Sequence, residues 1–103
     1  MKIEIIKTPN QLTKDELVSI FKKATGFNFQ KYCIDEFEID HNKNMFVPVT
    51  NISCKNTGYS AIIHKDYSIE VKSSVVQLSN KTNILGIADV LLSNGIIKVI
   101  NNS

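Results

Sequence analysis

The order of polar and apolar segments predicts an α+β fold in which two helices cover one face of a mostly antiparallel sheet. Two observations carry this prediction: a capped, amphipathic helical segment near the start of the chain, and several short segments with a period of two separated by turn residues. The expected order is β-α-β-β-β-β-α-β, with about six strands. The 103 residues fit one domain, 1–103, and 43% apolar residues are enough for a core without disulfides or metal.

The first helix is predicted at residues 14–25. Thr13 and Glu16 have the spacing of a capping box, in which each side chain satisfies a backbone N–H of the other residue. Gly26 stands at the position where a left-handed residue ends a helix. One apolar stripe follows between these signals and marks the buried face: Leu17, Ile20, Phe21 and Ala24.

The remaining elements follow from alternation and from turn residues. Residues 27–34 fit either a strand or a short helical turn, and both readings stay open. The second helix is expected at 84–93 after a polar opening at 79–83, with Gly86 marking close packing on the sheet. Its expected inner face consists of Leu85, Ala88 and Leu92, widened by Ile84, Ile87 and Leu91. The predicted strands are 2–7, 35–40, 45–52 (with Pro48 indicating an edge or bulge), 59–64, 68–78 and 96–100, with turns at 41–44, 56–58 and 65–66.

Composition narrows the classes of function. All twelve basic residues are lysine, and the net charge is only +2, so the forked guanidinium that reads bases and grips phosphate is missing and nucleic acid is an unlikely partner. Lysines and glutamate interrupt the first apolar residues, and no apolar run approaches the roughly 18 residues of a membrane span. We therefore expect a cytoplasmic protein, without membrane contact, whose two cysteines are free thiols.

Two cysteines and two histidines are the first candidate site. Cys33, His41, Cys54 and His64 are separated by 8, 13 and 10 residues, whereas zinc sites use closely spaced Cys or His pairs. The four glycines are scattered and form no phosphate-binding loop. The sequence therefore predicts neither a bound metal nor a cofactor.

The sharpest catalytic candidate is Glu70-Val71-Lys72. It resembles the Glu-x-Lys half of the PD-(D/E)XK nuclease motif, and the coarse order of elements around it is similar to that family's. The resemblance implies a carboxylate pair for Mg²⁺ and a lysine that positions the attacking water. The family's aspartate should lie on the preceding strand, but residues 59–63 contain no acid. We therefore expect no Mg²⁺-dependent cleavage, and a divalent-metal nuclease using Glu70 and Lys72 is kept as the alternative.

Glu36, Glu38 and Asp40 form the strongest candidate binding surface. Alternate residues of a strand share a face, so the three carboxylates are expected in a row about 7 Å apart, next to His41 and Asn42. By elimination, the sequence favours a non-enzymatic protein-binding module, of the inhibitor or immunity type, that blocks a larger enzyme or toxin. An acidic row would suit a basic partner such as a nuclease. The lysines around hairpin 59–72 are the second candidate surface for a protein partner. A weak nucleic-acid binder that uses its lysines and stacks bases on aromatic residues is a further alternative; the candidate aromatic residues are Phe27, Phe29, Tyr32, Tyr59 and Tyr67.

Overall fold

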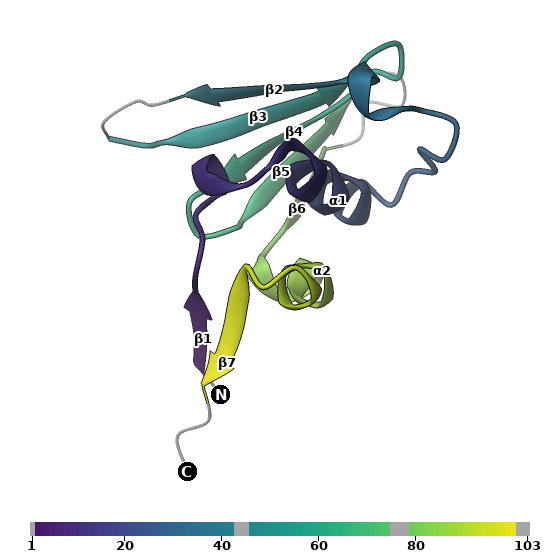
Figure 1. The fold of residues 1–103 in the computed structure, drawn as a ribbon. Helices are drawn as coiled ribbons and strands as arrows, with labels where there is room; N and C mark the ends of the chain where they lie inside the picture. Colours follow the sequence, from purple (N-terminus) through teal and green to yellow (C-terminus); the bar gives the residue numbers. More distant parts are fainter. Residues whose placement is uncertain (1, 43–45, 75–78, 101–103) are drawn as a thin grey trace.

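The chain forms two separate antiparallel sheets and two α-helices, which confirms the predicted α+β class (Figure 1). The structure, a computed structural model, describes residues 2–42, 46–74 and 79–100. Within these residues, five consecutive strands form a meander in the order β2-β3-β4-β5-β6, and β1 pairs with β7 in a two-stranded ribbon. The strands are β1 (Lys2–Ile5), β2 (Phe37–Asn42), β3 (Val49–Cys54), β4 (Tyr59–His64), β5 (Ile69–Ser73), β6 (Ser79–Thr82) and β7 (Ile97–Ile100), and the helices are α1 (Lys14–Thr25) and α2 (Ala88–Ser93).

Helix α1 begins and ends where the local signals predict. The Thr13 hydroxyl accepts a hydrogen bond from Glu16 N at 3.2 Å, and Thr13 N donates to Glu16 Oε1 at 2.9 Å. Both N-terminal donors are therefore satisfied without help from the rest of the molecule. At the other end Gly26 takes φ +67°, a left-handed conformation that costs glycine little.

The inner face of the meander, the face that α1 covers, carries the hydrophobic core. Phe21 of α1 is fully buried, and its ring lies 5.2 Å from that of Phe29 and 5.9 Å from that of Phe37, measured between centroids. Residues 27–33 are neither strand nor regular helix; Phe29 anchors this segment on the core, and a short 3-10 helix (Ile34–Glu36) leads into β2. The strands contribute alternate residues to the same core: Phe37, Ile52, Ile63, Ile69 and Val71.

The region after β5 differs from the prediction. Residues 79–83 were expected to be a polar lead into the second helix, yet Ser79–Thr82 form strand β6, which pairs with β5 through Glu70 and Lys81. A polar segment becomes an edge strand here because β5 supplies a complete set of backbone partners, which no local pattern reveals. The predicted strand 68–78 is shorter, Ile69–Ser73, and residues 75–78 lie outside the described part.

Strand β3 also starts later than predicted. The expected start at residue 45 lies outside the described residues, and the strand itself begins at Val49, directly after Pro48, which has no N–H for the ladder. Strand β2 runs two residues further than expected, through Asn42, which pairs with Val49. Residues 43 and 44 of the predicted turn are outside the described residues.

The second helix starts as a 3-10 helix (Ile84–Ile87) and continues as α2. Asn83 Oδ1 accepts hydrogen bonds from Leu85 N and Gly86 N and so fixes the tighter start. Since a 3-10 helix has three residues per turn, the inward face shifts: Ile87 and Leu91 are buried, whereas Leu85 is 62% exposed and Leu92 45% exposed. The predicted inward orientation of Leu85 and Leu92 is therefore wrong.

Gly86 marks close packing between this helix and the sheet. A Cβ at position 86 would collide with the Thr82 hydroxyl oxygen on β6. The contact explains why a glycine, a poor helix former, stands inside the segment.

The ribbon of β1 and β7 extends away from the body of the molecule (Figure 1). Ile6 N donates to Ile96 O at 2.8 Å, and the phenol of Tyr67, in the turn between β4 and β5, donates to the backbone oxygen of Lys7. Burial raises the pKa of Tyr67 above its usual value, so the phenol keeps its proton and remains a donor at neutral pH. These bonds connect the ribbon to the meander.

Candidate functional site: the outer face of the meander

The outer face of the meander is the side opposite to α1. Along each strand, the residues between the core positions point to this side, and the pairing register aligns them in rows across the strands. One row joins five strands. It consists of Asp40, Asn51, Ile62, Glu70 and Lys81.

Short side chains occupy the middle of this face and charged side chains occupy its sides. Asn51, Ser53 and Ser60 on β3 and β4 are half-buried. On one side, β2 presents the exposed carboxylates Glu38 and Asp40; on the other side, β5 and β6 present the exposed Lys72 and Lys81. The face is thus acidic at one edge strand and basic at the other.

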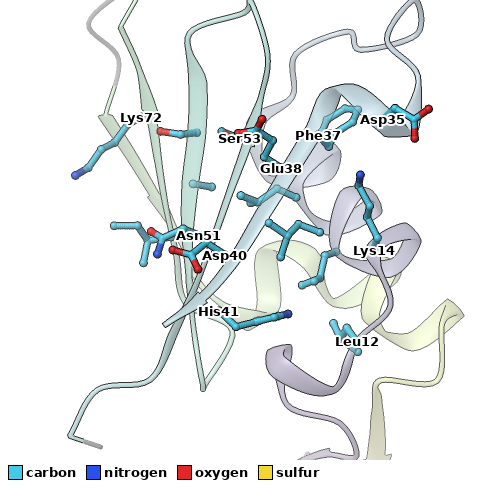
Figure 2. A pocket seen from close by; sticks show the side chains of 16 residues that line it. Leu12, Lys14, Asp35, Phe37, Glu38, Asp40, His41, Asn51, Ser53 and Lys72 are labelled. Atoms are coloured by element: carbon cyan, nitrogen blue, oxygen red, sulfur yellow. The ribbon is translucent and has the colours of Figure 1, made fainter. Parts of the chain in front are cut away.

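A hollow of about 910 Å³ lies along β2 (Figure 2). Figure 2 shows that Asp40 and Asn51 point away from α1, whereas His41 points to the helix side, near Leu12. The hollow is therefore lined from both sides of β2: on the outer side by Glu38, Asp40, Asn51, Ser53, Ser60, Ile62 and Lys72, and on the helix side by residues that include Leu12, Lys14 and His41. Because β2 is an edge strand, a partner can approach it from either side.

Glu38 and Asp40 are the members of the predicted acidic row that share this face. Glu38 forms an exposed ion pair with Lys55, with 3.3 Å between Nζ and Oε1. Within the described part of the chain, the Asp40 carboxylate has no hydrogen-bond or ion-pair partner. At least one carboxylate of the pair is therefore available to a ligand. Asn42 lies on the same side, in an exposed position at the end of β2.

Two predicted members lie elsewhere. Glu36 ends the 3-10 helix before β2, where it is half-buried and its Oε2 accepts a hydrogen bond from Cys33 N at 2.9 Å. The sequence suggested a solvated strand position, but the strand begins one residue later and Glu36 caps the preceding turn. His41 is on the inner side, where its Nδ1 lies 2.9 Å from the hydroxyl of the buried Thr50. It is therefore separated from the acidic row by the sheet itself.

Glu70 and Lys72 do share the outer face, as the nuclease-like motif requires. The residues paired with Glu70 across the strands are Ile62 on β4 and Lys81 on β6, so neither supplies a second carboxylate. Instead the Nε2 of His64 lies 2.8 Å from Glu70 Oε2. The hydrogen bond from His64 lowers the pKa of Glu70 below its usual value, and the positive charges nearby act in the same direction. The arrangement is a carboxylate in contact with an imidazole and beside two lysines.

The contact between His64 and Glu70 was not predicted from the sequence. The hairpin 59–72 was predicted, and its register places residue 62 opposite residue 70, which brings His64 diagonally close to Glu70. Counting outward from the predicted two-residue turn at 65–66 would pair residue 61 with residue 70 and put His64 and Glu70 on opposite faces. The observed loop has three residues, 65–67, with Tyr67 at φ 64°, and this shifts the register by one and brings the two side chains to the same face.

The four Cys and His residues do not converge. His41 and His64 lie on opposite sides of the sheet; Cys33 is exposed, and Cys54 is buried against the core. Burial raises the pKa of the Cys54 thiol, and a hydrogen bond with Thr57 opposes that shift. Among the described residues, no group of three or more His, Cys, Asp or Glu is arranged to hold a metal ion.

Comparison of the chain with protein-family models, with curated proteins and with solved structures found no match. None of the helices in the described ranges has both the length and the apolar character needed to cross a bilayer.

Proposed function

We propose that the protein is a binding module that docks through the outer face of the meander, along β2, onto a basic surface of a larger protein and blocks it. An enzyme or toxin that acts on nucleic acid is the class of partner that such a surface fits. The observation that supports the proposal is the separation of charge on a sheet face that no described element covers, with Glu38 and Asp40 at one edge and Lys72 and Lys81 at the other.

The shape of this face supports binding of a protein rather than simple solvation. An antiparallel sheet can leave one side to water, and long polar side chains then usually cover it. Here the centre is made of Asn51, Ser53 and Ser60, which leave a hollow that the side chains of a partner can fill. Ile62 adds a half-buried apolar residue to the floor, and burying it completely would favour association.

The charges define the chemistry of the partner. Lysine or arginine side chains that enter above β2 would meet Glu38 and Asp40, whose carboxylate has no partner among the described residues. Enzymes that bind nucleic acid expose basic surfaces of this kind, and a carboxylate row steers them by long-range attraction. Lys72 on the far side of the hollow would favour an acidic residue at a second point and so orient the partner.

The test is a charge-neutralising double variant, Glu38→Gln with Asp40→Asn. The immobilised wild-type protein is first used to capture its partner from cells that express the protein. The association rate of the captured partner with the wild type and with the double variant is then measured at several salt concentrations. We expect slower association and a weaker salt dependence, because exposed charges act mainly on the rate of encounter. The free energy of unfolding should change by no more than about 0.5 kcal/mol, since both side chains are exposed.

The matched control is Asp15→Asn with Asp89→Asn. It makes the same change in net charge, but on α1 and α2, behind the inner face. If the control slows association as much as the test variant does, the effect is one of net charge and the β2 site is excluded. Unchanged kinetics in the Glu38 and Asp40 variant would also remove this face from the interface.

A further inference from the structure

Among the described residues, strand β1 is paired on one side only, with β7, and its other edge presents a defined set of backbone groups. Ile6 N donates to Ile96 O, and the register pairs Glu4 with Lys98 and Ile3 with Val99. In an antiparallel ladder bonded pairs alternate with non-bonded pairs, so Glu4 bonds to β7 while the N–H and C=O of Ile3 point away from it. The other strand of the ribbon, β7, lies next to α2, and Ile96 N donates to Leu91 O at 2.9 Å. Strand β1 is therefore the open side of the ribbon.

The two faces of the ribbon differ in character. One face carries Ile3, Ile5, Ile97 and Val99; Ile97 is buried against the core, but Ile5 is 37% exposed and Val99 40% exposed. The opposite face carries Lys2, Glu4 and Lys98, with Ile100 opposite Lys2, and Glu4 pairs with Lys98 at 3.0 Å. A two-stranded ribbon with one apolar face is only marginally stable in water, and additional strands would stabilise it.

The charges along β1 are self-complementary. When two copies of β1 are placed antiparallel about a two-fold axis through Ile3, Ile3 meets Ile3 of the second copy, and Lys2 meets Glu4 of the second copy on both sides of the axis. The central pair uses the free N–H and C=O of Ile3, and the charged pairs fall at non-bonded positions, where side chains approach most closely. Hydrogen bonding and charge therefore select the same register.

We propose that β1 is a self-association surface and that its partner is a second copy of this chain. The two ribbons join into one four-stranded sheet in the order β7-β1-β1-β7. On one face a row of Val99 and Ile3 from both copies becomes continuous. On the other face Glu4 lies between Lys98 of its own chain and Lys2 of the second copy.

The position of the ribbon leaves room for this contact. It extends from one end of the elongated body, and β1 lies on its outer side (Figure 1). The outer face of the meander is not part of the contact, so each copy keeps its β2 surface. The inference is thus independent of the proposed function, and it implies that a dimer would present two such surfaces.

Charge exchange between copies tests the proposal. The variants Lys2→Glu and Glu4→Lys each place like charges opposite one another twice per dimer, whereas an equimolar mixture of the two restores both attractive pairs between unlike copies. Sedimentation is measured from about 10 µM to about 1 mM, because a contact this small associates weakly. We expect the wild type to dimerise, each variant alone to associate roughly tenfold more weakly, and the mixture to recover association.

A second variant tests whether the contact between copies can be lost while the β1–β7 ribbon within each copy stays intact. Ile3→Pro removes the N–H that points away from β7, so the ladder within the chain loses no hydrogen bond. It should abolish the dimer while the amide hydrogen exchange of Lys98 stays protected; Ile3→Val is the control and should dimerise. A wild type that is monomeric at 1 mM overturns the proposal. So does a dimer that is unaffected by the charge variants and by Ile3→Pro.

Discussion

The two faces of the meander are built from alternate residues of the same strands, yet they differ in what surrounds them. Ile63 and its neighbour Ile62 are the same residue type on the same strand; Ile63 is completely buried on the inner side, whereas Ile62 remains half-buried on the outer side. The difference shows that the burial of an apolar side chain depends on its position in the fold as well as on its residue type. Side chains on the face that the helices cover are buried, whereas the other face remains accessible to a partner.

The largest expected effect is on the inner face. Replacing Phe21 with Ala should reduce the free energy of unfolding by about 3–5 kcal/mol, because a fully buried ring in contact with Phe29 and Phe37 leaves a cavity. Urea unfolding measures this loss. The matched change on the outer face is Ile62→Ala, which should cost only about 1 kcal/mol, since part of that side chain is already in water. Equal losses would contradict the difference between the faces.

A smaller effect is expected where the second helix meets the sheet. Gly86→Ala should destabilise the protein by about 1–2 kcal/mol, because the new methyl group collides with the Thr82 hydroxyl on β6. The same substitution in a Thr82→Ala background should cost clearly less. If the two changes are simply additive in thermal or urea unfolding, the collision is not the cause.

The smallest effect concerns the ion pair on the outer face. Hydrogen bonding to His64 lowers the pKa of Glu70 in the folded state, so the ionised carboxylate stabilises the fold above the usual glutamate pKa. This contribution is lost as the pH falls through the lowered value. The stability difference between wild type and Glu70→Gln should therefore shrink as the pH falls below about 4.3.

The background variant His64→Ala tests the cause of that pH dependence. Without the imidazole, most of the pH-dependent difference between Glu70 and Gln at position 70 should disappear, as unfolding measurements between acid and neutral pH would show. A difference that persists unchanged would assign the lowered pKa to Lys72 and Lys81 instead.

The candidate site was only partly predictable from the sequence. Period-two alternation correctly put Glu38 and Asp40 on one face, and Glu70 with Lys72 on one face, because alternation is a property of any strand. It failed for Glu36, since the strand starts at Phe37 and a 3-10 turn precedes it. Alternation also could not reveal that both pairs share the same uncovered side, because this depends on how five strands are ordered and on where α1 packs.

By itself, the sequence determined the elements whose signals are local. Thr13, Glu16 and Gly26 set both ends of α1 through bonds and backbone conformations within a few residues, and β4 was predicted with its observed limits, Tyr59–His64. Tertiary structure decided the rest. The polar segment Ser79–Thr82 is a strand only because β5 offers it backbone partners, and Leu85 faces solvent because the 3-10 start rotates the helix. Capping energy is confined to one turn of chain, whereas strand pairing and burial depend on residues that folding brings together from distant positions.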